Sequence, residues 1–221
     1  MGCIVKHSRT AYDVLKRVVD LIVSAVALVV LSPLIAVVAL LVSVKLGLPV
    51  IFRQRRPGKD ARLFTVYKFR TMRDAAPGTS SAEAVGSDAT RLTPLGRTLR
   101  STSLDELPEF YNVFKGDMSI VGPRPLLSEY LDRYNEEQAR RHEVRPGITG
   151  WAQVNGRNTV SWDERFKMDV WYVDHRSFTL DARILFKTVS AVLSREGVSA
   201  PGSETMQPFQ GNAENDATKE S

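Results

Sequence analysis

Two adjacent carboxylates, Asp105 and Glu106, stand where the sequence predicts the start of a helix. The free N–H groups of a helix start attract phosphate and lower the pKa of a carboxylate. The pattern therefore predicts that Asp105 stays ionised, as a nucleophile or as an oxygen ligand of Mg²⁺ beside substrate phosphates. Neighbouring helical side chains point in different directions, so we expect one carboxylate to act and the other to orient. The structural alternative is a capping box, in which Ser103 and Glu106 only begin a helix over residues 104–114.

Arg124 is a further candidate, because prolines flank it in the sequence Gly122-Pro123-Arg124-Pro125. A backbone that is fixed by proline reduces the entropy lost when a side chain binds a ligand. A guanidinium offers paired donors that suit a diphosphate, so Arg124 is a candidate phosphate contact. The alternative is a rigid turn with a solvent-facing arginine, leading into a helix from Pro125 to about His142.

A basic run contains more candidates: between Arg53 and Arg73 the chain has eight Lys and Arg residues and one acid, Asp60. From charge alone, such a run suits lipid headgroups, diphosphates and nucleic acid about equally. The chain has no helix-turn-helix, RNA-recognition or zinc-finger spacing, so we expect no nucleic-acid partner. The candidate substrate-binding cations in and after this run are Arg56, Lys59, Lys68, Arg70 and Arg100.

A glycine-rich segment follows further along the chain, from Val144 to Arg157. Gln153, Asn155 and Arg157 occupy alternate positions there, and three hydrogen-bonding side chains on one face suit a sugar or base pocket. The alternative is a turn-rich connection. The three histidines and the single cysteine have no spacing typical of a metal site or a catalytic triad.

The element that must position these residues is an apolar stretch of 24 residues without a charge, from Leu21 to Val44, interrupted by Ser32-Pro33. About 20 apolar residues suffice to span the ~30 Å hydrocarbon core of a membrane. Basic residues flank both ends of the stretch, and such residues favour the cytoplasmic side. A helix that enters, bends at Ser32-Pro33 and returns leaves both flanks on that side. The sequence therefore predicts a re-entrant anchor, and the stretch is too long for a cleaved signal peptide.

The remaining pattern predicts an α+β fold that is mainly helical. Two β-rich runs, 50–52 and 63–67, flank Arg-Pro-Gly-Lys-Asp at 56–60 and predict one β-hairpin. Later helices are predicted from Ser161, where Glu164 completes a capping box, and from Leu180 to Arg195. Several of these helices are amphipathic and are expected to rest at the membrane interface.

This pattern also predicts the domain organisation. We expect an N-terminal tail and re-entrant membrane anchor over 1–48, followed by a cytoplasmic catalytic domain over 49–198. Residues 74–90 have the composition of a surface loop, and 199–221 form a polar tail that is expected to be disordered.

Taken together, these motifs resemble the bacterial sugar transferase family, the small monotopic polyprenyl-phosphate phosphoglycosyl transferases. The resemblance covers about residues 12–200, nearly everything except the two tails. The segments that carry it are Ser32-Pro33, Arg56-Pro57-Gly58, residues 67–72, 103–108, 112–119, 122–125, 145–150 and 153–158.

The resemblance implies a reaction in two steps at the cytoplasmic face of the bacterial inner membrane. Asp105 attacks the β-phosphate of a UDP-sugar, which releases UMP and leaves a phosphosugar on the carboxylate. A polyprenyl phosphate, typically undecaprenyl phosphate, then takes the phosphosugar and forms a lipid diphosphate sugar. By the same resemblance, Glu106 is the partner of Asp105, Arg124 contacts phosphate, and Mg²⁺ at Asp105 counters the diphosphate charge. Such a step begins the assembly of glycoconjugates and polysaccharides.

Two other functions fit parts of the pattern. A Mg²⁺-dependent hydrolase would use the same carboxylates on a UDP-sugar with water as the acceptor. A non-catalytic membrane adaptor would use the basic run only to bind anionic lipids. The sequence does not identify the sugar, and it leaves the oligomeric state open.

Overall fold

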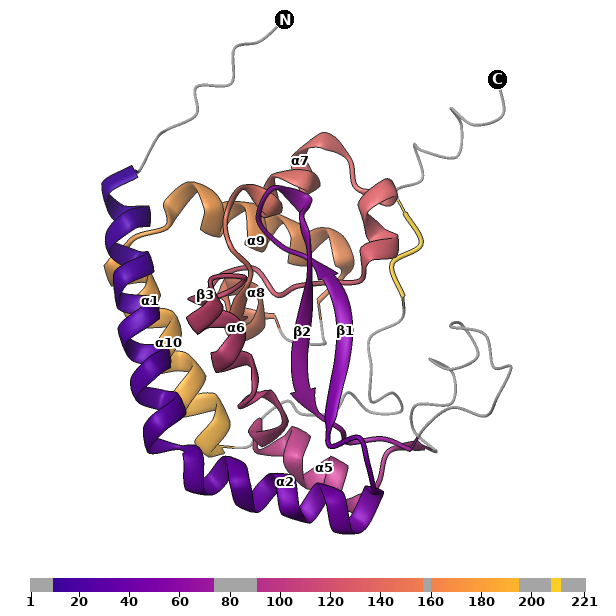
Figure 1. The fold of residues 1–221 in the computed structure, drawn as a ribbon. Coiled ribbons are helices and arrows are strands. Elements are labelled where there is room, and N and C mark those ends of the chain that lie inside the picture. Colours follow the sequence, from indigo (N-terminus) through magenta and orange to yellow (C-terminus); the bar gives the residue numbers. More distant parts are fainter. Residues whose placement is uncertain (1–9, 74–90, 157–159, 195–207, 212–221) are drawn as a thin grey trace, which may run out of the picture.

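A bent pair of N-terminal helices leads into a β-hairpin, and short helices pack around both (Figure 1). The computed structural model describes residues 10–73, 91–156, 160–194 and 208–211. The α-helices are α1 (Thr10–Val30), α2 (Ser32–Leu46), α5 (Pro94–Ser101), α6 (Glu109–Lys115), α7 (Glu136–Ala139), α8 (Trp151–Asn155), α9 (Trp162–His175) and α10 (Phe178–Ser194). The 3₁₀ turns are η1 (Lys59–Ala61), η2 (Leu104–Glu106), η3 (Ser128–Arg133) and η4 (Arg140–Glu143). The strands are β1 (Ile51–Pro57), β2 (Leu63–Phe69), β3 (Ser119–Val121) and β4 (Gly147–Thr149). The predicted mainly helical α+β fold is confirmed.

The two N-terminal helices meet at Leu31 and are bent by 62°. Pro33 lies in the first turn of α2, where its missing N–H costs no helical hydrogen bond and its ring prevents α1 from continuing. The predicted break at Ser32-Pro33 is therefore confirmed. Among the described residues, no single helix is long and apolar enough to cross a bilayer, whereas the bent pair together has the length and composition to do so.

α1 has a polar face that docks on the domain. Arg17, Asp20 and Ser24 lie at spacings of three and four residues, which place them on one side of a helix. Arg17 donates to the carbonyl of Val113 (2.6 Å), and the buried Asp20 accepts from the backbone N–H of Ile120 (3.1 Å). α1 consequently packs along α6 and β3, and it lies beside α10 (Figure 1).

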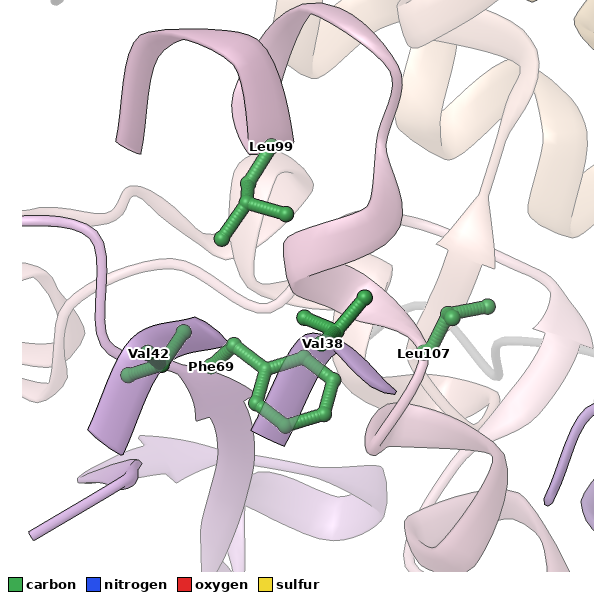
Figure 2. Close-up of a cluster of buried hydrophobic side chains, with 5 residues drawn as sticks. All are labelled: Val38, Val42, Phe69, Leu99 and Leu107. Carbon is green, nitrogen blue, oxygen red and sulfur yellow. The ribbon is translucent and has the colours of Figure 1, made fainter. Parts of the chain in front are cut away.

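α2 docks through an apolar cluster, which we call the α2 cluster (Figure 2). Its buried members are Val38 and Val42 of α2 together with Phe69, Leu99 and Leu107. Phe69 ends β2, Leu99 lies in α5, and Leu107 directly follows η2. The second helix of the bent pair thus holds together three segments of the domain that are separate in the sequence.

The predicted β-hairpin forms, with β1 and β2 antiparallel over seven residues each. Both strands are longer than the predicted runs, so Arg56, which was expected in the turn, belongs to β1. A second pair, β3 and β4, is parallel and was not predicted, because strands of three residues are too short to show alternation. Gly147 permits this pairing, since a Cβ at that position would lie 2.1 Å from the backbone N of Gly122.

The helix predicted from Pro125 to His142 is wrong. That region contains η3, α7 and η4 in place of one continuous helix. Asn135 and Gln138 form a capping box that begins α7. This capping box is a helix-start signal in the middle of the segment predicted as one helix. Arg141 is buried in an ion pair with Asp169 of α9 (2.7 Å), a partner from another helix. Tertiary contacts here override the local pattern.

The later part of the chain agrees better with the sequence. Ser161 and Glu164 form the predicted capping box of α9, and α10 covers the helix predicted from Leu180 onward. The predicted loop at 74–90 lies outside the described residues. Of the predicted C-terminal tail only residues 208–211 are described, and there Phe209 packs on the domain and is only 3% exposed.

Candidate active site

Asp105 and Glu106 lie in η2, a single 3₁₀ turn between α5 and α6. Ser103 has a φ of 57°, in the left-handed region, and turns the chain immediately before η2. The capping box that was the structural alternative does not form, because the Ser103 side chain makes no capping hydrogen bond. The predicted helix over 104–114 is divided into η2 and α6. The Glu106 carboxylate is therefore available to other partners.

Glu106 is the centre of a group of charged side chains from separate segments. Its Oε1 accepts from Nζ of Lys68 in β2 (2.7 Å) and from Nη2 of Arg124 in the proline-flanked segment (2.8 Å). Lys68 Nζ also lies 3.0 Å from Oε1 of Glu109 in α6. We call these four residues and Asp105 the charge cluster. Two predicted cations, Lys68 and Arg124, are thus brought to the predicted carboxylates.

The α2 cluster explains how the charge cluster is positioned. Three members of the α2 cluster are sequence neighbours of charged candidates, in the pairs Lys68-Phe69, Leu99-Arg100 and Glu106-Leu107. The apolar member of each pair is buried against α2. Because adjacent side chains leave the backbone in different directions, its charged neighbour points away from that core.

Asp105 is 8% exposed and forms no hydrogen bond or ion pair with another described residue through its carboxylate. Burial raises its pKa to about 6, and the charge of Glu106 adds to this rise, while Lys68, Arg100 and Arg124 oppose it. The sequence predicted a lowered pKa from the helix start, and this direction is wrong because burial and a like charge dominate. With this pKa, about nine-tenths of Asp105 is still ionised at pH 7.

The two glutamates of the charge cluster differ in pKa. Burial alone would raise the pKa of Glu106, but the charges of Arg124 and Lys68 hold it well below its usual range. Burial raises the pKa of Glu109 to about 7, against the opposing charge of Lys68. The sequence analysis missed Glu109, although its spacing of three residues from Glu106 is a helical signal that both side chains share one side.

Arg56 and Arg100 lie toward this site. Arg56 is on the same face of the hairpin as Lys68, because its cross-strand partner Phe64 is four residues from Lys68 in β2. Burial lowers the pKa of Arg56 to about 10, and the nearby charge of Arg124 contributes. Arg100 donates from Nε to Oγ1 of Thr71 (3.2 Å), and its charge opposes the raised pKa of Asp105.

Arg70 and Lys59 lie elsewhere. Arg70 donates to the carbonyls of Leu46, Gly47 (2.7 Å) and Leu48 (3.3 Å), so its guanidinium holds the end of α2 and the chain that follows. Lys59 is exposed in the hairpin turn and lines a cleft next to α1.

The glycine-rich segment does not present its polar side chains on one face. Gln153 and Asn155 lie in α8, where residues two apart point in different directions, whereas the prediction had assumed an extended chain. Gln153 donates to the carbonyl of Ile148 (3.0 Å), and Asn155 Oδ1 accepts from Nζ of Lys187 (2.6 Å). Neither side chain contacts a member of the charge cluster among the described residues. Arg157 lies outside the described residues.

The oxygen ligands present in the site can be compared with those that the predicted Mg²⁺ would need. No group of three or more His, Cys, Asp or Glu side chains that could hold a metal ion occurs in the described ranges. Mg²⁺ at phosphate-transfer sites is usually held by one or two carboxylates together with substrate phosphates. The Asp105 carboxylate, which has no partner among the described residues, fits binding of Mg²⁺ together with substrate phosphates. It does not fit a metal site that is formed by protein ligands alone.

Comparison with known proteins places this site in a family. The model of the family described as Bacterial sugar transferase matches residues 11–195. The chain belongs to the bacterial sugar transferase family. This membership confirms the predicted family and transferase class, and the matched range includes both helices of the bent pair and the whole charge cluster.

Several sugar transferases are similar over most of this chain. The uncharacterized sugar transferase EpsL of Bacillus subtilis (strain 168) is 50% identical over 201 residues, which are 91% of this chain and 98% of that protein. The undecaprenyl-phosphate galactose phosphotransferase of Salmonella typhimurium is 40% identical, over 83% of this chain and 41% of its own length. The UDP-glucose:undecaprenyl-phosphate glucose-1-phosphate transferase of Klebsiella pneumoniae is 42% identical, over 80% and 39%. This sugar transferase thus spans about two-fifths of the relatives that are named for a reaction.

Proposed function

We propose that this sugar transferase moves a phosphosugar from a UDP-sugar to a polyprenyl phosphate, with Asp105 as the covalent carrier. The observation that carries the proposal is the state of Asp105. It is a buried, mostly ionised carboxylate without a partner among the described residues, and it stands beside cations that other carboxylates hold in place. The relatives named for undecaprenyl phosphate support this acceptor class.

In the first step, an Asp105 carboxylate oxygen forms a bond to the β-phosphorus of the UDP-sugar. The bond from that phosphorus to the oxygen bridging the two phosphates breaks, and UMP leaves with the electron pair. The raised pKa of Asp105 makes its carboxylate a stronger nucleophile than an ordinary exposed aspartate, while it remains mostly ionised at neutral pH.

The other members of the charge cluster bind and orient the phosphates. Glu106 stays ionised and fixes Lys68 and Arg124, whose remaining donors are directed to the anionic substrate. Arg124 is suited to this role, because about a third of its side chain is accessible (37%). Mg²⁺, when bound through Asp105 and the phosphates, supplies further positive charge against the diphosphate.

In the second step, an oxygen of the lipid phosphate attacks the phosphorus held on Asp105, and the carboxylate leaves as the free side chain. This step requires the site to meet a membrane lipid. Large exposed apolar side chains cover α1, α2 and α10, and they support a re-entrant anchor and an interfacial helix, while the basic flanks of the bent pair favour the cytoplasmic face. Examples are Ile22, Val26, Val30, Leu40, Val44, Phe186 and Val189.

The covalent carrier is tested by incubating the detergent-purified protein with Mg²⁺ and each of a panel of UDP-sugars, without lipid acceptor. We expect UMP and a mass increase of one phosphosugar on the peptide that contains Asp105, and neither with Asp105→Asn. Continuous release of free sugar phosphate together with UMP would favour the hydrolase instead. UMP that appears only when lipid phosphate is added would favour transfer in a single step. If no donor yields UMP even with lipid phosphate, the adaptor is favoured.

The membrane topology needs a separate measurement. Single cysteines before residue 15 and after residue 48, in a Cys3→Ser background, are labelled in intact cells with a membrane-impermeant reagent. A re-entrant anchor leaves both positions protected until the cells are opened. Labelling of one position from outside would show that the bent pair crosses the membrane.

A further inference from the structure

The tail residue Phe209 fills an aromatic pocket on the domain. Its ring centroid lies 5.0 Å from that of Phe166 and 5.7 Å from that of Tyr130, both in edge-to-face geometry. It also stacks on Tyr134 at 6.0 Å, with an angle of 20° between the rings. These are favourable arrangements for aromatic pairs, and they explain why Phe209 is almost completely buried.

The backbone of the tail is held as well. The N–H of Phe209 donates to the hydroxyl of Tyr130 (3.1 Å), and its carbonyl accepts from the guanidinium of Arg133. Both partners lie in η3, which begins three residues after Pro125. The tail therefore docks in a specific register and is not merely an apolar contact.

The aromatic pocket is connected to a buried arginine. The guanidinium of Arg141 lies 5.8 Å from the ring centroids of both Tyr134 and Phe166, the two rings that also contact Phe209. Arg141 pairs with Asp169 (2.7 Å) and donates to the backbone carbonyl of Arg124 (2.8 Å). A fully buried guanidinium with these partners has one permitted position, because leaving either partner would expose an unpaired polar group to the interior.

Arg124 in turn reaches the active site. Its carbonyl is fixed by Arg141, while its own guanidinium donates to Glu106. A continuous series of contacts thus runs from Phe209 through the rings of Tyr134 and Phe166 to Arg141, and from there to Arg124. If the rings that line the pocket of Phe209 were displaced, Arg141 and with it the guanidinium of Arg124 would move.

We propose that Phe209 is a positioning residue of the active site, which acts through Arg141 on Arg124. This inference rests on the proposed function. It gives the C-terminal tail, which lies far from Asp105 in the sequence, a part in the transfer reaction.

The test is a double-mutant cycle on UMP release by the full chain. We expect Phe209→Ala to lower kcat/KM by roughly 10- to 100-fold, since small misplacements of a binding group have effects of this size. Gln210→Ala, at the exposed neighbouring tail position, is the matched control and should remain near wild type. In an Arg124→Lys background, Phe209→Ala should cost less than about threefold, because the two changes remove the same interaction.

The inference is overturned if Phe209→Ala is as active as wild type. It is also overturned if Phe209→Ala lowers kcat/KM by the same factor in the Arg124→Lys background as in the wild-type background. If Phe209→Ala does not yield folded protein, the same cycle with Phe209→Leu decides, because leucine keeps the pocket filled but removes the ring contacts. An inactive wild type would overturn the proposed function and this inference with it. An active wild type with an unaffected Phe209 variant would contradict this inference alone.

Discussion

The segment around Asp105 and the segment around Gln153 were both predicted to bind substrate, and the structure treats them in opposite ways. In the first, the largely buried carboxylate of Glu106 pairs with two cations, Lys68 of the hairpin and Arg124 from beyond α6. In the second, Gln153 bonds to a carbonyl five residues away and Asn155 to its own helix and to Lys187. The first also contains a carboxylate without a partner among the described residues.

This difference is the structural basis for proposing that the charge cluster, and not α8, is the reacting part of the molecule. Neutral polar side chains that bond to nearby backbone or to a surface lysine, as Gln153 and Asn155 do, mainly stabilise a turn or a helix. Charged side chains that are buried together, with one of them left unpaired, have an unfavourable solvation energy that only a ligand offsets. The comparison therefore predicts large effects at the charge cluster and small effects at α8.

The largest effect is expected for Asp105→Asn. An amide is not a nucleophile toward phosphate, so UMP release should fall at least about 1,000-fold. The midpoint of thermal unfolding should not decrease, because the substitution removes a buried charge next to Glu106. A variant that keeps more than a tenth of wild-type turnover would remove Asp105 from the mechanism.

The next effect is expected for Lys68→Met. Without this cation, Glu109 loses its ion-pair partner and Glu106 keeps only Arg124, so turnover should fall about 100-fold. Unfolding should also become easier by roughly 3 kcal/mol, because one partner of a buried ion pair is removed. Steady-state kinetics and chemical denaturation measure the two results, with Arg55→Met in the exposed part of β1 as the control. Equal behaviour of the two variants would contradict the charge cluster.

The pH dependence gives a smaller, graded effect. The pKa of Asp105 is raised to about 6, so the nucleophilic form is present above this pH and is lost as the pH falls through it. The rate of adduct formation should therefore drop about tenfold for each pH unit below 6. Single-turnover UMP release between pH 5 and 8 measures this limb. A rate that stays level down to pH 5, as expected for an aspartate that titrates in its ordinary range near pH 4, would contradict the raised pKa.

The smallest effects are expected at α8. Gln153→Ala and Asn155→Ala should each change kcat/KM by less than about threefold, because neither side chain contacts the charge cluster among the described residues. Kinetics with several UDP-sugars should be compared, since an effect on one donor only would assign this segment to sugar selection. A loss as large as that of Lys68→Met would eliminate the contrast between the two segments.

Much of the fold was accessible from the sequence where one signal dominated. Pro33 ended a helix, two β-rich runs on either side of Pro57-Gly58 formed the hairpin, and Ser161 with Glu164 began α9. The prediction failed over 125–142, where Asn135 gave a second start signal and the buried Arg141 was fixed by a partner in α9. Partners that are distant in the sequence leave no local pattern.

Several residues of the candidate site could be predicted from the sequence, whereas their pKa values and two further residues could not. Asp105, Glu106 and Arg124 were found from their spacing and flanking residues. The pKa of Asp105 was predicted in the wrong direction, because its burial, which raises the pKa, depends on how η2, β2 and α2 pack. Glu109 and Phe209 were missed for the same reason, as a glutamate in a helix and a phenylalanine in a polar tail are ordinary until their surroundings are known.

The α2 cluster has a consequence for how the enzyme can be handled in the laboratory. Val38 and Val42 complete the core against which Phe69, Leu99 and Leu107 are packed. Removing residues 1–48 to obtain a more soluble fragment would strip that core and leave the neighbouring site residues without support. If the proposed re-entrant anchor is used in the membrane, solubilisation should keep both helices and work through detergent, nanodiscs or polar substitutions on the outward faces of α1 and α2.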